Sequence, residues 1–192
     1  MSTTESPTAT PTRLNGVNVD DLVETIEAVE SDANLARFQF RAHTEWKDGG
    51  RSETRIQEFT HAGEIDDSRE KPFVLEGDEP PVLLGGNTAP NAVETVLHAL
   101  ASCLSVGFIY NAAAKGIEVE ALDFDLEGDL DLRGFLGLDD SVRPGYSDVR
   151  VTYRVQADAS REELEELCEY TQATSPVVDL LRTPVNVEVS MG

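Results

Sequence analysis

The sequence predicts an α+β protein, and three patterns support this prediction. A long apolar helix is expected over residues 90–116, and several other segments alternate apolar and polar residues as strands do. A capping box at Ser160–Glu163 opens a further, amphipathic helix. Because turn signals separate the first strands, we expect the sheets to be mostly antiparallel.

The long helix is the segment around which we expect the chain to be organised. Pro90 and Asn91 mark its start, since Asn is a good N-cap, and Gly116 marks its end. The side chains around Cys103, near the middle of this segment, are small. A helix that is apolar on most sides and has a small-residue face belongs at the centre of a domain or at a subunit interface.

The remaining elements follow from local patterns along the chain. We predict a helix opening at residues 19–23, strands over 36–47, 51–61, 72–76, 119–133 and 147–158, helices over 160–173 and 177–181, and a last strand over 185–190. Residues 62–69 are expected to form a turn. The Ser/Thr/Pro-rich residues 1–13 are expected to form a disordered tail, which leaves residues 14–192 as a single domain.

Acidic residues dominate the composition, with 37 Asp and Glu against 15 Lys and Arg and a net charge of -22. Nucleic acids and anionic membranes carry the same sign, so neither is expected as a partner. The acidic excess fits a protein that stays soluble in concentrated salt. The low number of lysines favours a salt-loving organism over an ordinary acidic cytosolic protein. No signal peptide and no run approaching a membrane span is evident, so we expect a cytoplasmic protein.

Cys103 is the sharpest candidate for chemistry. Two cysteines do not make a disulfide framework, and a buried cysteine commonly packs as a small hydrophobe. This structural interpretation is stronger for Cys168, which lies on the core face of its predicted helix. We find no zinc-ligand spacing, phosphate-binding loop or Ser/His/Asp pattern, so neither a metal nor a cofactor is expected.

The central helix resembles the cysteine helix of the OsmC/Ohr superfamily. The resemblance rests on residues 91–95, followed by residues 97–104 with Cys103 near their end. The order of the predicted elements over residues 35–192 agrees with that family, and residues 128–146 are similar to its less-studied OsmC-like branch. The resemblance implies antiparallel sheets wrapped around a long Cys-bearing helix, in an intertwined homodimer.

The resemblance also implies an activity, the reduction of organic hydroperoxides in oxidative stress defence. In this family a helix cysteine attacks the peroxide as a thiolate, and a second cysteine resolves the resulting sulfenic acid to a disulfide. An arginine stabilises the thiolate and a glutamate orients that arginine. An external dithiol then restores the reduced protein.

The family's functional residues carry over only in part. Cys103 matches the attacking cysteine, whereas Ser175, before Pro176, stands where the family has its second cysteine. Cys168 lies two helical turns earlier and is not expected to replace it. The glutamate position falls on Val93, with Glu94 next to it. The arginine comes from the early hairpin, where the candidates are Arg51, Arg55 and Arg41.

Two functions follow from these residues. The first is a one-cysteine thiol peroxidase, in which Cys103 attacks, Arg51 or Arg55 activates it and an external thiol resolves it. The second is a non-catalytic OsmC-like dimer that binds a small apolar ligand or senses oxidant through Cys103. Loss of the chemistry with retention of the fold is a third outcome, because a fold does not imply a function.

Overall fold

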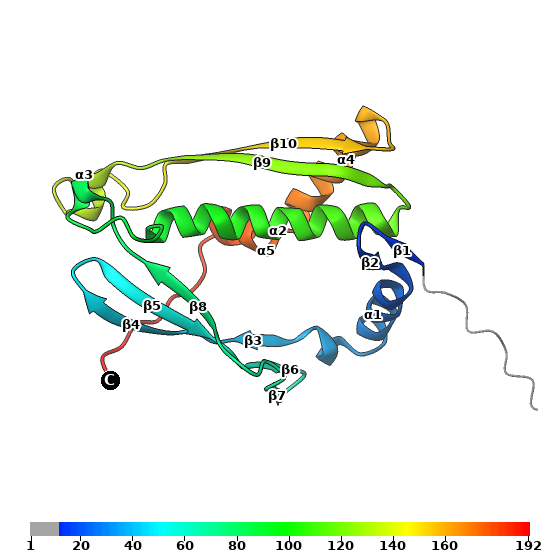
Figure 1. Ribbon diagram of the computed structural model, residues 1–192, viewed down its shortest axis with the longest axis horizontal. Coiled ribbons are helices and arrows are strands. Elements are labelled where there is room, and N and C mark those ends of the chain that lie inside the picture. Colours follow the sequence, from blue (N-terminus) through cyan, green and yellow to red (C-terminus); the bar gives the residue numbers. More distant parts are fainter. Residues whose placement is uncertain (1–11) are drawn as a thin grey trace, which may run out of the picture.

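The computed structural model describes residues 12–192 and has the predicted α+β architecture. A long helix, α2, runs beside a two-stranded ribbon, β9–β10, and small sheets from the first half of the chain lie apart from it (Figure 1). The predicted tail, residues 1–13, lies almost entirely outside the described residues. The elements are β1 (Arg13–Leu14), β2 (Val17–Asn18), α1 (Val19–Ser31), β3 (Phe38–Phe40), β4 (His43–Asp48), β5 (Arg51–Ile56), β6 (Phe59–His61), β7 (Glu64–Asp66), β8 (Phe73–Gly77), α2 (Ala92–Ala114), β9 (Val119–Asp129), α3 (Leu132–Phe135), β10 (Asp148–Ala157), α4 (Arg161–Thr174) and α5 (Pro176–Arg182), with short 3-10 turns at Ala33–Ala36 and Pro81–Leu83.

Helix α2 has the predicted ends. The Asn91 side chain accepts the backbone N–H of Glu94 at 2.9 Å, and the Glu94 carboxylate accepts the N–H of Asn91 at 2.8 Å. This reciprocal capping box satisfies two N–H groups that a helix start leaves without partners. Gly116 follows the last turn with a φ of +75°, a conformation that favours glycine.

Helix α2 is also long and apolar enough to cross a membrane by length and composition alone. The expectation that no run approaches that length is therefore wrong. The core helix of a water-soluble protein has the same properties. Here Leu100, Leu104 and Phe108 are buried by β9, β10, α4 and α5, which makes α2 the main core element of the described chain.

Strands β9 and β10 form a long antiparallel ribbon over α2. Val151 pairs with Leu126 and Tyr153 with Phe124, so apolar side chains from both strands face the helix. The alternate positions carry opposite charges, and Arg154 bonds to Asp123 at 2.8 Å on the solvent face. The strict alternation of the sequence thus gives one dry and one wet face.

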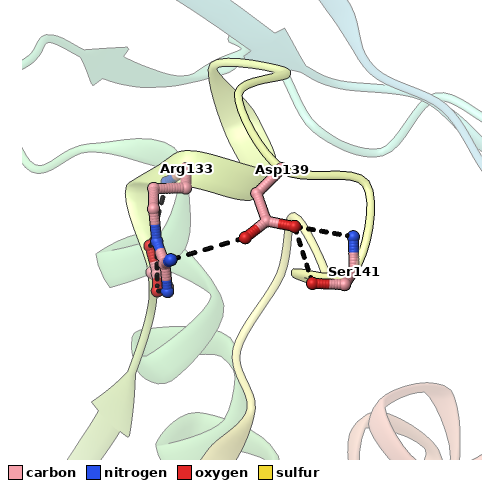
Figure 2. Close-up of polar contacts among 4 residues, drawn as sticks. Arg133, Asp139 and Ser141 are labelled. Atoms are coloured by element: carbon pink, nitrogen blue, oxygen red, sulfur yellow. Dashed lines mark hydrogen bonds and ion pairs between the residues drawn. The ribbon is translucent and has the colours of Figure 1, made fainter.

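The connection between β9 and β10 contains a short helix that sequence patterns missed. We predicted a strand over 119–133, but β9 ends at Asp129, because Asp131 caps α3 by accepting the N–H of Arg133 at 3.0 Å. Figure 2 shows Arg133 directed toward Asp139 at 3.4 Å, while Asp139 accepts the backbone N–H and the hydroxyl of Ser141. These contacts shape the loop that returns the chain to the side of α2.

The predicted strands over 36–47 and 51–61 are each broken in two. The outer parts pair as β3 with β6 and the inner parts as β4 with β5, so the hairpin bends between residues 40–43 and 56–59. The predicted turn over 62–69 contains β7, because Ala62 and Gly63 both have positive φ and make a tight hairpin from β6. Strand β8 adds to β5, as a third strand.

The C-terminal helices follow their predicted signals, but the last strand does not form. Ser160 and Glu163 make the capping box of α4, and Ser175 caps α5 just before Pro176. The predicted strand over 185–190 has no regular secondary structure and lies outside any sheet, with Val187 and Val189 exposed. A strand needs the edge of a neighbouring strand, and the described chain brings none to this segment.

Candidate functional site

Cys103, on α2, lies against Ser175, at the junction of α4 and α5. The Cys103 Sγ and Ser175 Oγ atoms are 3.1 Å apart, and Ser175 is only 5% exposed. The Ser175 Oγ atom also accepts the backbone N–H of Val178 at 3.2 Å, as the N-cap of α5. Its own hydrogen therefore remains available to a thiolate at Cys103, which would have no proton to donate.

A close approach of two helices produces this contact. A Cβ atom on Gly107 would lie 3.1 Å from the Thr171 Cγ2 atom, so the small residue lets α4 pack tightly on α2. Ser175 is one turn beyond Thr171, and Cys103 is one turn before Gly107. The two helices therefore run in opposite directions, and their next contact along the interface is the Cys103–Ser175 pair.

Cys168 occupies a different environment from Cys103. It is partly buried beside Phe108 and Leu167 in the core cluster at the C-terminal half of α2. Burial raises the pKa of the Cys168 thiol, and the nearby carboxylate of Glu165 adds to this shift. Both cysteines are free thiols. A thiol with a raised pKa is a poor nucleophile, which favours a packing role for Cys168.

Glu94, which stands next to the family's glutamate position, is engaged at the start of α2. Its carboxylate bonds to the N–H of Asn91 in the capping box. Nine residues separate it from Cys103, and at about 100° per residue the two side chains leave the helix on opposite sides. Glu94 therefore stabilises the start of α2. Its position does not support a role in orienting a group at Cys103 of the same chain.

The three candidate arginines belong to the hairpin that lies apart from α2 (Figure 1). Arg51 and Arg55 are on β5, and Arg55 pairs with Glu53 at 2.8 Å. Arg41, between β3 and β4, donates to the Thr60 hydroxyl at 2.8 Å. Among the polar contacts of residues 12–192, none joins any of these arginines to Cys103.

Tyr153 is a residue near both thiols that the sequence patterns did not single out. Burial raises the pKa of its phenol, and the nearby thiols of Cys168 and Cys103 add to this shift. The Tyr153 Oη atom is buried and has no hydrogen-bond partner within residues 12–192. The only signal in the sequence is its inward position in the alternating strand β10.

A cavity of about 470 Å³ lies between the N-terminal half of α2, β10 and α5. Its volume is within the range of about 300–1,000 Å³ that is common for small-molecule sites. Most of the lining is apolar, and the polar side chains come from the β9–β10 loop, β10, α4 and α5. The apolar lining includes Val96, Leu100, Leu104, Val151 and Val178.

Large apolar side chains are exposed on two parts of the described chain. On α2, Val106 and Tyr110 are nearly half exposed, on the stripe that also contains the exposed residues Ala99 and Ser102. The three-stranded sheet β4–β5–β8 also exposes large apolar side chains: Trp46, Phe73, Val74 and Leu75. Large apolar side chains that gather on an exposed face commonly mark an interaction site.

Within residues 12–192, no group of three or more His, Cys, Asp or Glu side chains is arranged to hold a metal ion. At the candidate site itself, the Cys103 thiol lies beside the Ser175 hydroxyl.

Comparisons with known proteins identify the family and the fold. The model of the OsmC family, described as OsmC-like protein, matches residues 85–190, which include α2, Cys103 and Ser175. A search of curated protein sequences finds no match.

Solved structures share the fold at low sequence identity. An OsmC-like protein from Mycoplasma pneumoniae superposes with a TM-score of 0.58 at 14% identity, over 76% of this chain and 89% of that one. An organic hydroperoxide resistance protein OsmC from Legionella pneumophila has a TM-score of 0.50 at 16% identity, over 78% and 93%. These structures show the fold alone, and the family model covers more than half of the sequence. The chain belongs to the OsmC-like protein family.

Proposed function

We propose that this protein is a thiol-dependent peroxidase that reduces organic hydroperoxides through Cys103. The observation that carries the proposal is the 3.1 Å contact between the Cys103 sulfur and the buried Ser175 hydroxyl. A hydrogen bond to sulfur favours the thiolate, which is the form that attacks a peroxide. The name of the Legionella relative, an organic hydroperoxide resistance protein, supports the same substrate class.

The proposed reaction has two stages. The Cys103 thiolate attacks the outer oxygen of a hydroperoxide, the O–O bond breaks, and the departing alkoxide takes a proton to become an alcohol. Sulfur is thereby oxidised to a sulfenic acid. An external dithiol attacks that sulfur, water leaves, and the second thiol of the reductant displaces Cys103 as a thiolate. Ser175 cannot form a disulfide, which is why the resolving thiol must be external.

The activating cation is proposed to come from a second copy of the chain. The described chain places no arginine at Cys103, while the hairpin that carries Arg51 and Arg55 lies apart with its apolar side chains exposed. A homodimer in which this hairpin covers the exposed stripe of α2 would bury both apolar surfaces. It would also bring one of the two arginines toward the other copy's thiol.

The dimer can be tested separately from the chemistry. Gel filtration with light scattering should give about twice the chain mass of 20.9 kDa. Val106→Glu places a charge on the exposed α2 stripe and should shift the protein toward the monomer. A wild-type protein that elutes only as the monomer would remove the dimer from the proposal.

The peroxidase activity is tested by stopped-flow consumption of cumene hydroperoxide by the reduced protein. Wild type and Cys168→Ser should consume about one equivalent rapidly, whereas Cys103→Ser should not. Arg51→Gln and Arg55→Gln identify the activating residue, because loss of the activating cation should slow the reaction at least about tenfold. If wild type reacts no faster than free cysteine, the protein is not a peroxidase, and a non-catalytic dimer becomes the preferred interpretation.

A further inference from the structure

The cavity beside α2 has an apolar wall and a charged rim, and Cys103 is not among the residues that line it. Leu100 and Leu104 face the cavity from α2, Val151 from β10 and Val178 from α5. All four belong to, or pack against, one core cluster, so the wall is held by the fold itself. Such a wall suits a hydrocarbon chain or ring.

Two arginines form the positively charged part of the rim. Arg143 comes from the β9–β10 loop and Arg182 from the end of α5. Neither guanidinium has a hydrogen-bond or ion-pair partner among residues 12–192. Asp148 also lines the cavity and bonds to neither arginine, so the charged groups of the lining sum to one positive charge.

This positive rim contrasts with the overall charge of the molecule. The chain carries a net charge of -22, and carboxylates outnumber cations by more than two to one. On the neighbouring ribbon, Arg150 and Arg154 are both paired with carboxylates. Two guanidinium groups left free beside one apolar cavity are therefore available to an anion from outside the chain.

We infer that the cavity binds an apolar monocarboxylate. The hydrocarbon part lies against Leu100, Leu104, Val151 and Val178, and the carboxylate meets Arg143 and Arg182 at the rim. Arginine matches a carboxylate through two parallel hydrogen bonds, which a neutral alcohol of the same length cannot reproduce. The inference does not depend on the peroxidase proposal, because no step at Cys103 is involved.

The test is calorimetric titration of the full chain with octanoate and, separately, with octan-1-ol in one buffer. We expect one octanoate per chain, bound at least about tenfold more tightly than octanol. The double variant Arg143→Gln/Arg182→Gln should lose this preference. Arg161→Gln makes a single change of the same kind at a highly exposed arginine outside the cavity lining. This variant should keep the preference for octanoate. Val96→Trp, which fills the cavity, should weaken both ligands.

Circular dichroism of each variant verifies that it is folded, and Cys103→Ser should bind octanoate as wild type does. The inference is overturned if octanoate does not bind saturably, if octanoate and octanol bind with equal affinity, or if Arg161→Gln loses the preference for octanoate as fully as the double variant does. Undiminished octanoate binding by Val96→Trp would also overturn it, since the ligand would then lie elsewhere.

Discussion

The Ser175 hydroxyl bridges two groups: its oxygen accepts the N–H of Val178 and lies 3.1 Å from the Cys103 sulfur. A side chain at position 175 is thus within bonding reach of the reactive atom. The geometry has a direct chemical consequence if that side chain is changed to a thiol.

Ser175→Cys should convert the protein from external to internal resolution. After Cys103 becomes a sulfenic acid, the new thiol attacks its sulfur, and an intramolecular disulfide forms with loss of water. Mass spectrometry after one equivalent of cumene hydroperoxide should show the 103–175 disulfide. Ser175→Ala is the control and should instead accumulate over-oxidised Cys103. Over-oxidation of Ser175→Cys to the same extent would contradict the prediction.

Asp78 should make folding stability depend on pH. Its buried carboxylate accepts the backbone N–H of Thr88, Glu79 and Gly86 and the Thr88 hydroxyl, and these bonds lower its pKa from 3.8 to about 2. A lowered pKa in the folded state stabilises the fold at pH values above the ordinary pKa of an aspartate. This contribution is lost as the pH falls from about 4 toward 2.

The variant Asp78→Asn tests this dependence by urea unfolding at several pH values. It should be less stable than wild type at pH 7. The backbone N–H groups around position 78 need an acceptor, and the NH2 group of an asparagine is a donor. The difference from wild type should shrink between pH 4 and 2. Asp140→Asn, at an exposed carboxylate, serves as the control and should follow the wild-type curve. A constant difference for Asp78→Asn across that range would show that the carboxylate is not the cause.

Tyr153→Phe should stabilise the fold in the absence of ligand. The Tyr153 hydroxyl is buried without a partner in the described chain, whereas the Tyr146 hydroxyl donates to the Val93 carbonyl at 2.9 Å. Removing an unsatisfied buried hydroxyl should raise the free energy of unfolding by about 1 kcal/mol, and Tyr146→Phe should lower it by about the same amount. Urea unfolding measures the free energy of unfolding of both variants. A change in the same direction for Tyr153→Phe and Tyr146→Phe would contradict the interpretation.

Gly128→Ala should destabilise the ribbon where it meets the loop. A Cβ atom at Gly128 would lie 2.5 Å from the Tyr146 ring, which must then move. We expect a loss of about 1–3 kcal/mol in the free energy of unfolding. At Gly145, on the same loop, the nearest atom to a Cβ is 3.8 Å away, so Gly145→Ala is the matched control. Similar losses in both variants would argue against a steric cause.

Local signals in the sequence determined the ends of the long helices, although the short helix α3 was missed. Asn91 with Glu94, Ser160 with Glu163, and Ser175 before Pro176 each act through bonds between residues a few positions apart. The strict alternation of β9 and β10 was equally visible, because a strand with one dry face repeats every two residues. The cysteine motif on α2 and the order of elements were enough to identify the family.

Tertiary structure decided what these signals could not. The bend of the first hairpin, the unpaired segment 185–190 and the β7 hairpin all depend on which strand edges meet in space. The neighbour of Cys103 was decided in the same way: Gly107 and Thr171 set the approach of α2 to α4, and Ser175 is placed beside the sulfur as a result. Helix caps and strand alternation depend only on residues that are close in the sequence, so they can be predicted from the sequence alone. Contacts between residues far apart in the sequence depend on packing, so only the tertiary structure reveals them.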